Sequence, residues 1–368
     1  MIGVVLGTTG ELIKLAPVLL RLREQGQRTL LMSTGQQVEQ LPDFLRDFGL
    51  PPVDLDLARG FRGGDLERKR EVPVWVATVA ATVARRRREL AVRLRSDGGR
   101  PVVLVHGDTM TTVLGALIGR LLGATVGHVE AGMRSGRLND PFPEELNRRV
   151  AARLVDVHFA PGAGPADNLR RERVGGRIVD TGQNTIRDAV DLAAGVPREV
   201  AVPEGEFGLV SLHRFELIER PSLMGPLLEL LRERSRTAPL LFVDHPVTAA
   251  AISAHGFERH FDGRFRRIPR LRYFPFIALL RASRFLVTDS GGSQEECAFL
   301  GHPCLVHRAV TEHATGLGRS VVLSGMDLDI VRAFLADPDR YRVPADGPSA
   351  RPTEVILTEL ERMGAIPG

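Results

Sequence analysis

Residues 102–130, VVLVHGDTMTTVLGALIGRLLGATVGHVE, contain the pattern that decides the fold. Val102–His106 and Thr125–Val129 are short, almost continuous apolar runs, and Thr111–Leu122 between them has the apolar spacing of a helix. Strands that are apolar on both faces are typical of parallel sheets covered by helices. The stretch therefore predicts a strand–helix–strand unit of an α/β protein.

The same alternation extends over the whole chain. In the first half it continues through a strand at Val4–Gly7, a helix at Leu12–Gln25 and a strand at Thr29–Ser33. The pattern restarts in the second half with predicted strands at Gly208–Leu212, Leu240–Asp244, Phe285–Thr288 and Pro303–Val306. We expect two Rossmann-like halves, each a doubly wound parallel sheet, around a central cleft. Ligands of such sheets bind at the carboxyl ends of the strands.

The expected domain boundary lies in a region rich in Pro and Gly. Pro161–Pro165, which reads PGAGP, and Gly195–Pro197 interrupt the pattern, so a boundary is expected near residues 165–200. We predict an N-terminal domain over 1–168 and a C-terminal domain over 169–351. The predicted last helix, within 352–368, follows a loose segment at 343–352 and is expected to pack back on the first domain.

Composition excludes several classes of protein. Of 368 residues, 43% are hydrophobic and 26% charged, and no apolar run reaches the ~20 residues that span a bilayer. The N-terminus lacks the features of a signal peptide, so a cytoplasmic protein is expected. Two cysteines provide neither a disulfide framework nor a metal pattern, and the excess positive charge is scattered apart from Arg85–Arg88. We therefore expect no metal, no membrane contact and no nucleic acid.

Carboxylates follow the strands of the opening stretch. Asp108 comes directly after one strand and Glu130 after the next, while Glu144 and Arg148 are spaced to share one face of a following helix. Each feature has a structural alternative, since an Asp before a helix caps it and a helical Glu–Arg pair is usually a surface ion pair. Together, three carboxylates beside an arginine are typical of acid–base catalysis.

Other strand ends carry features suited to anions. Gly7 begins a turn into a helix that contains Lys14. This turn is either an anion site or an ordinary connection between a strand and a helix. His213 and Arg214 follow a strand of the second half. No G-x-G-x-x-G fingerprint is present, which argues against a dinucleotide cofactor.

The most specific local pattern is DSGGSQEE at 289–296. Ser290, Gly291 and Gly292 form a turn before a helix predicted at Gln294–Leu300, where N–H groups and a hydroxyl bind a diphosphate. Glu296 follows on that helix, where a carboxylate binds the two hydroxyls of a ribose. This segment predicts nucleotide binding.

Taken together, these segments resemble the bacterial non-hydrolysing UDP-N-acetylglucosamine 2-epimerases. The resemblance runs from residue 7 to about residue 319, and the stretches that carry it are VHGDTMTTVLGALIGRLLGATVGHVEAGMRSGRLNDPFPEELNRR and LVTDSGGSQEECAFLGHPCLV. It implies a fold like that of the GT-B glycosyltransferases. It also implies a UDP-sugar substrate, no cofactor and a homodimer.

The resemblance also assigns roles to individual residues. It implies a catalytic set of Asp108, Glu130, Glu144, Arg148 and His213. It implies substrate or UDP contacts from Lys14, Arg214, His245, Phe276, Ser290, Gly291, Gly292 and Glu296, with Phe276 near uracil and Lys14 near the phosphates. A regulatory site found in many members would include Gln36 and Glu39.

The chain departs from the family pattern at several positions. Thr9 stands where the family has an arginine, Gln37 where it has a histidine, and His313 in place of another arginine. The departure at Gln37 bears on activation through the regulatory site.

The chemistry of the family fits these residue types. The proton on C2 of the sugar is not acidic until the bond from C1 to UDP begins to break, after which a carboxylate removes it to give 2-acetamidoglucal. Re-addition of UDP with protonation from the other face inverts C2. Three alternatives stay open: a hydrolysing 2-epimerase, a GT-B glycosyltransferase, and an inactive nucleotide-sugar-binding protein.

Overall fold

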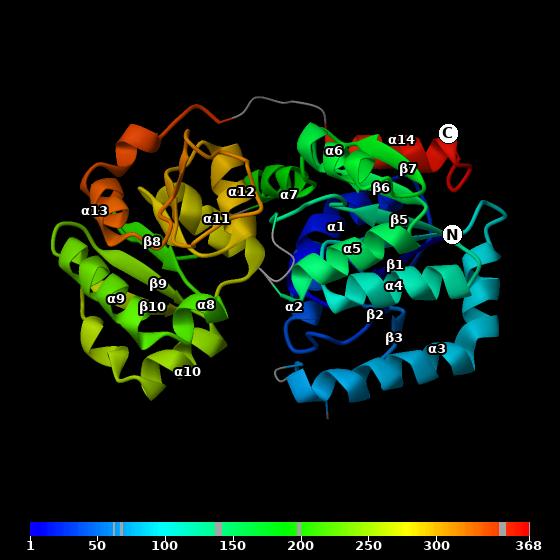
Figure 1. The fold of residues 1–368 in the computed structure, drawn as a ribbon, viewed down its shortest axis with the longest axis horizontal. Helices are drawn as coiled ribbons and strands as arrows, with labels where there is room; N and C mark the ends of the chain where they lie inside the picture. Colours follow the sequence, from blue (N-terminus) through cyan, green and yellow to red (C-terminus); the bar gives the residue numbers. More distant parts are fainter. Residues whose placement is uncertain (62, 67–68, 137–141, 197–199, 346–350, 368) are drawn as a thin grey trace. The chain divides into compact units, whose positions relative to one another are not determined.

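A computed structural model describes residues 1–61, 63–66, 69–136, 142–196, 200–345 and 351–367 (Figure 1). Residues 346–350 of the segment expected to be loose lie outside the described residues. The chain divides into two compact units, one of Met1–Ala189 with Ala350–Gly368 and one of Val190–Ser349.

The first unit is built on a parallel sheet of seven strands in the order β3-β2-β1-β4-β5-β6-β7. Its strands are β1 (Ile2–Leu6), β2 (Thr29–Ser33), β3 (Leu55–Asp56), β4 (Val102–His106), β5 (Thr125–Val129), β6 (Val157–Ala160) and β7 (Arg177–Asp180). Its helices are α1 (Thr9–Glu24), α2 (Leu41–Asp47), α3 (Val72–Arg95), α4 (Met110–Leu121), α5 (Glu144–Leu154), α6 (Ala163–Arg171) and α14 (Pro352–Arg362), with a 3₁₀ turn at Lys69–Glu71.

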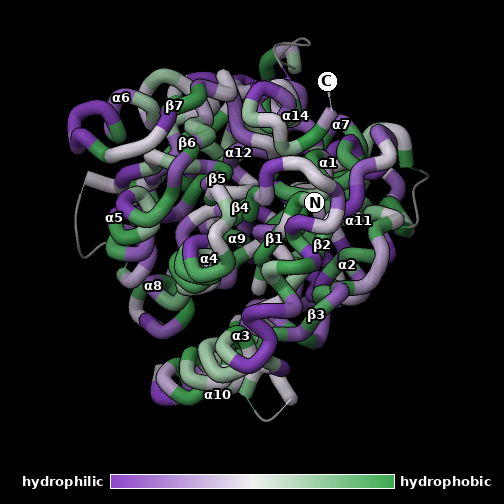
Figure 2. Tube along the Cα trace, turned by 90° about the vertical axis from the view of Figure 1, so that its right-hand side faces the viewer, coloured by the Kyte–Doolittle hydropathy of each residue, from purple (hydrophilic) through white to green (hydrophobic). Residues whose placement is uncertain are grey.

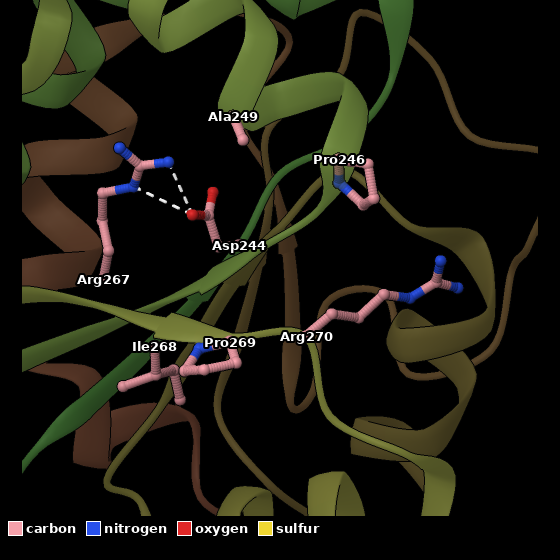
Figure 3. Close-up of a pocket in the computed structure, with 7 residues that line it drawn as sticks. All are labelled: Asp244, Pro246, Ala249, Arg267, Ile268, Pro269 and Arg270. Atoms are coloured by element: carbon pink, nitrogen blue, oxygen red, sulfur yellow. Dashed lines mark hydrogen bonds and ion pairs between the residues drawn. The ribbon is translucent and has the colours of Figure 1, made fainter. Parts of the chain in front are cut away.

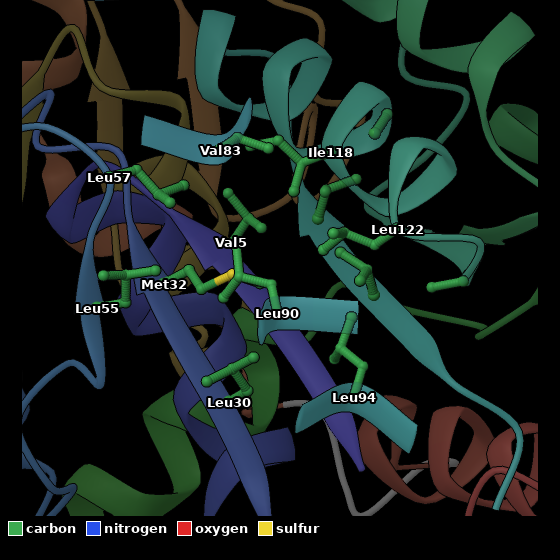
Figure 4. Close-up of a cluster of buried hydrophobic side chains, with 14 of the residues drawn as sticks. Val5, Leu30, Met32, Leu55, Leu57, Val83, Leu90, Leu94, Ile118 and Leu122 are labelled. Carbon is green, nitrogen blue, oxygen red and sulfur yellow. The ribbon is translucent and has the colours of Figure 1, made fainter. Parts of the chain in front are cut away.

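Helices cover both faces of this sheet. Strand order reverses between β1 and β4, so right-handed crossovers place α1 and α2 on one face and α4 and α5 on the other. Helix α3 contacts α4, and a core cluster lies between these two helices and the strands (Figure 4). Leu90 and Leu94 of α3 and Ile118 of α4 are at most 5% exposed, which explains the apolar spacing of both helices.

The C-terminal helix α14 belongs to the first unit. It contacts α1, and Arg21 of α1 donates from Nε to Glu354 of α14 at 2.8 Å (Figure 1). On its other side, Glu359 pairs with Arg177 of β7 at 2.8 Å. These contacts hold the chain end against the unit in which the chain begins.

The first unit extends beyond the boundary expected at residue 168. Strand β7 pairs with β6 in parallel, with Val157 opposite Arg177, so the segment after 168 completes the first sheet. The boundary between the units falls at Ala189, inside helix α7 (Ile186–Ala194). Ala189 lies within the region 165–200 in which the sequence predicts a boundary, but after the limit at 168, because the segment at Pro161–Pro165 leads into α6 and β7 of the same sheet.

The second unit repeats the architecture with six parallel strands in the order β10-β9-β8-β11-β12-β13. The strands are β8 (Gly208–Ser211), β9 (Leu240–Asp244), β10 (Phe265–Pro269), β11 (Leu286–Thr288), β12 (Cys304–Val306) and β13 (Val321–Leu323). The helices are α8 (Phe215–Ile218), α9 (Pro221–Ser235), α10 (Pro246–Ala254), α11 (Tyr273–Ala282), α12 (Gly291–Leu300) and α13 (Leu328–Ala336), with 3₁₀ turns at Phe257–His260 and Pro338–Tyr341. The fold class predicted from the sequence, α/β with two doubly wound parallel sheets, is confirmed.

Candidate active site

Gly7 connects β1 to α1 in a space that admits no side chain. A Cβ atom at this position would lie 2.3 Å from the hydroxyl oxygens of both Thr34 and Thr111. Those two hydroxyls hydrogen-bond each other at 2.7 Å, so the ends of β1, β2 and the start of α4 are drawn together. Glycine is required here because the backbone passes too close to these two side chains to leave space for a Cβ atom.

The N–H groups of this turn are already occupied. The Glu11 carboxylate accepts from the N–H groups of Gly7 at 2.7 Å and Thr8 at 2.9 Å, and the side-chain oxygen of Gln37 accepts from the N–H of Thr9 at 2.9 Å. Burial raises the pKa of Glu11 to about 7, despite these hydrogen bonds. The interpretation of the turn as an open anion site is therefore wrong, because the protein's own side chains fill it.

Glu130 is the most constrained carboxylate at the ends of the first sheet. Its backbone has φ +67°, a left-handed conformation that costs a non-glycine residue about 1–3 kcal/mol. The side chain is buried, and its Oε2 accepts from Nζ of Lys14 and from Nδ2 of Asn184, with Nε2 of His106 at 3.8 Å. Strain of this kind persists where the surroundings fix it, which is typical of functional sites.

Asp108 is held by a separate group of residues. Its Oδ2 accepts from Arg148 of α5, whose other terminal nitrogen lies 3.5 Å from Glu145. The Asp108 carbonyl also accepts from the Asn147 side chain at 2.9 Å. Arg148 is 4% exposed and Glu145 is fully buried, so a buried carboxylate fixes the arginine that pairs with Asp108.

The sequence predicts that Glu144 and Arg148 share one face of a helix, and α5 contains both residues. Arg148 pairs with Asp108 and with Glu145, the neighbour of Glu144. Glu144 is the first residue of α5 and is half-buried. Residues three and four positions apart lie on nearly the same face of a helix. The spacing alone therefore does not tell whether Arg148 pairs with Glu144 or with Glu145.

The two carboxylates Asp108 and Glu130 lie close together. Strand β4 pairs with β5, and each strand is followed by one of them. A Cβ atom at Gly107 would lie 3.9 Å from Oε1 of Glu130, so this carboxylate lies against the turn that carries Asp108. The structure thus brings together two carboxylates, each paired with a cation.

Two buried histidines near these carboxylates are uncharged. Burial lowers the pKa of His106 to about 3, although the nearby Glu130 carboxylate opposes this shift. Burial likewise lowers the pKa of His128 to about 4, and its Nε2 lies 2.7 Å from the carbonyl oxygen of Gly107. Both rings are neutral at neutral pH, so Lys14 and Arg148 supply the positive charge.

In the second unit, Asp289 connects the ends of β8 and β11. It is 1% exposed and accepts from the N–H groups of His213 at 3.0 Å and Arg214 at 2.8 Å. Although it begins the DSGGSQEE segment, Asp289 therefore acts as a structural residue that positions the His213 loop.

His213 and His245 form a pair at this sheet edge. Their ring centroids are 4.5 Å apart, and Ser211 Oγ lies 3.2 Å from Nε2 of His245. The His213 side chain is 34% exposed. Burial lowers the pKa of both histidines, and the charge of Arg270 adds to the effect. The pair is neutral, so arginines supply the positive charge here as well.

Helix α12 begins at Gly291, three residues earlier than expected. Ser290 is its N-cap and accepts from the N–H of Ser293 at 3.4 Å, while Gly291 and Gly292 lie in the first turn. A Cβ atom at Gly291 would lie 2.5 Å from the ring of His313, so no other residue fits. The first N–H groups of a helix have no intrahelical acceptors, and this end is suited to a phosphate.

Glu296 lies within α12 beside an aromatic residue of α11. The Glu296 side chain is 5% exposed. Burial raises the pKa of Tyr273 well above its usual value, and the negative charge of Glu296 adds to the effect. Phe276, three residues along α11, is half-buried. The sequence did not single out Tyr273.

A hollow of about 530 Å³ opens at the carboxyl ends of β9 and β10 (Figure 3). Its lining residues are Asp244, Pro246, Ala249, Arg267, Ile268, Pro269 and Arg270. Arg267 donates to Oδ2 of Asp244 from Nε at 3.0 Å and from a terminal nitrogen at 2.5 Å, and Figure 3 shows Arg270 extending in the other direction. The hollow adjoins His245, and the sequence did not predict it.

The two residues expected at a regulatory site differ in environment. Gln36 accepts from the Thr111 hydroxyl at 3.1 Å and is half-buried near the end of β2. Glu39 is exposed, and its N–H donates to Asp65 at 3.1 Å. Only Gln36 therefore contacts the turns that surround Gly7.

Asn184 and Glu145 were not singled out from the sequence as site residues. Asn184 follows strand β7, so the rule that places ligands at strand ends could have drawn attention to it. Glu145 gave no such signal, because its place beside Arg134, Arg148 and Arg149 depends on the packing of α5.

Two features are absent from the described residues. No group of three His, Cys, Asp or Glu side chains among them is arranged to hold a metal ion. No described helix is long and apolar enough to cross a membrane. The cytoplasmic location expected from the sequence stays a prediction.

Comparisons with known proteins identify the family of the chain. The family model described as UDP-N-acetylglucosamine 2-epimerase matches residues 21–334. The enzyme of that name from Bacillus subtilis (strain 168) is 32% identical over 354 residues, which cover 92% of this chain and 88% of that protein.

Two solved structures are similar over nearly the whole chain. The UDP-GlcNAc 2-epimerase of Methanocaldococcus jannaschii, in complex with UDP-GlcNAc and UDP, has a TM-score of 0.80 at 25% identity and covers 98% of this chain and 99% of that chain. The enzyme of Neisseria meningitidis, bound to UDP-GlcNAc, has a TM-score of 0.79 at 27% identity with the same coverage. The chain therefore belongs to the UDP-N-acetylglucosamine 2-epimerase family.

Proposed function

We propose that this protein interconverts UDP-N-acetylglucosamine and UDP-N-acetylmannosamine by eliminating and re-adding UDP. The observation that carries the proposal is the pair of buried or half-buried carboxylates, Asp108 and Glu130, each held by its own cation at adjacent strand ends. Inversion at C2 requires one group that removes a proton and another that returns one to the opposite face. Two separately held carboxylates supply that requirement.

In the first step, the bond between C1 and the UDP oxygen breaks and its electron pair leaves with UDP. The proton on C2 passes to one carboxylate, and the C2–H electron pair forms the double bond of 2-acetamidoglucal. In the reverse step, a UDP oxygen bonds to C1 while the second carboxylate delivers a proton to the other face of C2. Before the first step one carboxylate is ionised and the other holds the proton that it later delivers, and after the step their roles are exchanged. Arg148 and Lys14, which pair with these two side chains, offset the negative charge of the ionised one.

The second unit supplies the groups suited to UDP. In this proposal the first turn of α12, with Ser290, Gly291 and Gly292, binds the diphosphate, and Glu296 binds the ribose hydroxyls. Phe276 lies against the uracil. His213 and Arg214 stabilise the negative charge that develops on the departing diphosphate. His245 supports the ring of His213, consistent with their 4.5 Å separation.

One assignment from the resemblance changes and two are kept. Lys14 donates to Glu130, so we assign it to the carboxylate rather than to the phosphates. Glu144 stays in the proposed catalytic set as a half-buried group at the start of α5. A regulatory site that includes Gln36 and Glu39 stays a prediction.

The test is a proton NMR time course with UDP-N-acetylglucosamine in deuterated water. Deuterium at C2 in accumulating UDP-N-acetylmannosamine supports the proposal. Free N-acetylmannosamine with UDP would instead indicate the hydrolysing reaction. Neither exchange nor product, at enzyme concentrations where UDP binds, would overturn it.

We also propose that the protein is a homodimer. Leu117 and Leu121 of α4 and Leu146 and Val150 of α5 are between 37% and 47% exposed, and the two helices contact each other. Helix α4 is largely hydrophobic along its length in Figure 2. An apolar patch of this kind on a well-formed domain is typical of a protein interface. Sedimentation should give twice the monomer mass, and Leu117→Asp should give the monomer; a monomeric wild type would refute the proposal.

A further inference from the structure

The side chain of Asn184 connects the candidate catalytic carboxylate to the segment between β7 and α7. It is 3% exposed, and its Nδ2 donates to Oε2 of Glu130. The same oxygen accepts from Nζ of Lys14. A neutral amide and a charged amine therefore converge on one oxygen of Glu130.

The orientation of the Asn184 amide is fixed by its other end. Its Oδ1 accepts from the backbone N–H of Ile186 at 3.2 Å, at the start of α7. Because an amide has one accepting oxygen and one donating nitrogen, this bond turns the donor toward Glu130. The side chain cannot rotate to offer its oxygen instead without losing the bond at α7.

A hydrogen bond to the charged form of a carboxylate favours that form. Four other titratable groups face Glu130 or its neighbours: Lys14 of α1, His106 of β4, His128 of β5 and Asp108 after β4. Both histidines are neutral, and Asp108 is itself paired with Arg148. Lys14 and Asn184 are thus the two donors to Glu130 that these contacts provide.

We propose that Asn184 is a positioning residue that holds Glu130 ionised and oriented for proton transfer. The inference rests on the proposed function, in which Glu130 exchanges the proton of C2. Asn184 acts through Glu130 rather than by contact with the reacting atoms. A purely structural Asn at this place would matter only through its bond to α7.

Asn184→Asp separates these two roles. The new carboxylate keeps an oxygen that accepts from Ile186 N–H, so the start of α7 is retained. Its second oxygen faces Glu130 in place of the N–H₂ group, so two carboxylates share one site. Like charges in such a site raise the pKa of the pair. Asn184→Ser, which shortens the side chain and removes the donor, is the second variant.

The matched control is Asn168→Asp, the same substitution in the same unit. Asn168 Nδ2 donates to the carbonyl of Gly132 at 2.9 Å, so the change also removes one hydrogen bond, but from a backbone group. The measurement is the pH profile of kcat and KM for UDP-N-acetylglucosamine, together with thermal unfolding of each variant.

We expect the acid limb of the Asn184→Asp profile to move to higher pH by at least about one unit, with kcat on that limb about tenfold lower and KM within about twofold. Asn184→Ser should move the limb in the same direction by less, and Asn168→Asp should leave it in place. A folded Asn184→Asp or Asn184→Ser variant with the wild-type profile would overturn the inference. Absence of epimerisation by the wild type would instead count against the proposed function.

Discussion

Substitution of the buried Glu145 tests the network that positions Arg148. The Glu145 side chain is fully buried, and its oxygens lie 3.1 Å from Arg149, 3.5 Å from Arg148 and 3.9 Å from Arg134. Glu145→Gln keeps the shape of the side chain but removes its charge, which leaves the facing guanidinium groups without this counter-ion. Breaking a buried ion pair by removing one partner costs about 3–5 kcal/mol.

That cost predicts a large change in thermal stability. At about 2–4 °C of Tm for each kcal/mol, the Glu145→Gln variant should unfold roughly 6–20 °C below the wild type. Differential scanning calorimetry measures this directly. Turnover should also fall, because Arg148 would then be held by Asp108 without its second carboxylate.

Glu172→Gln is the matched control. Glu172 pairs with two of the same arginines, Arg134 at 2.7 Å and Arg149 at 3.4 Å, but its side chain is 19% exposed. Partial exposure should limit its cost to about 1 kcal/mol. The reasoning is refuted if Glu145→Gln lowers Tm no more than Glu172→Gln does.

Three further predictions concern the carboxylates, the α12 turn and the buried histidines. Asp108→Asn and Glu130→Gln should each lower kcat by at least about 10²-fold while UDP affinity, measured by calorimetry, stays at the wild-type value. Gly291→Ala should weaken UDP binding, since its Cβ would lie 2.5 Å from the His313 ring and one of the two must move. Burial lowers the pKa of His302 to about 3, so below about pH 6.5 the unfolded chain binds a proton that the folded chain does not. Stability should therefore fall with acidity by about 1.4 kcal/mol per pH unit from this group, and His302→Gln should remove that slope in urea unfolding.

Each of these has an outcome that would contradict it. Near-native turnover of either carboxylate variant would remove that residue from the acid–base pair. Gly164→Ala serves as the control for Gly291→Ala, because a Cβ atom at Gly164 meets no other atom within 4 Å. Equal UDP affinity in the two alanine variants would place the diphosphate elsewhere. An unchanged pH slope in His302→Gln would mean that other groups dominate acid unfolding.

Much of the fold was predictable because its signals are local. The predicted strand at Thr125–Val129 matches β5 in both bounds, and the predicted helix at Thr111–Leu122 is shifted by one residue from α4. The start of α12 was misplaced because Gly291 and Gly292 are poor helix formers that the Ser290 cap and the close approach of His313 nevertheless place in its first turn. Capping and packing overrode local propensity there.

The positions of the carboxylates in the candidate site were predictable from the sequence, but the residues that contact them were not. Asp108 and Glu130 were identified because they follow apolar strands, and a parallel sheet gathers such residues at one edge. The sequence left the Gly7 turn open between an anion site and an ordinary connection of strand to helix, since the residues that occupy its N–H groups are a Glu one helical turn away and Gln37 from the end of another strand.

The sequence by itself determined the alternation of strands and helices, the two parallel sheets and the strand ends where carboxylates lie. These follow from apolar periodicity and from short motifs, which act over a few residues. Only the tertiary structure decided that Arg148 pairs with Asp108, 40 residues away, and that Lys14 and Asn184 meet on Glu130, 116 and 54 residues away. Such partners are selected when packing buries polar groups that must each find a counterpart, and no local pattern specifies which counterpart that is.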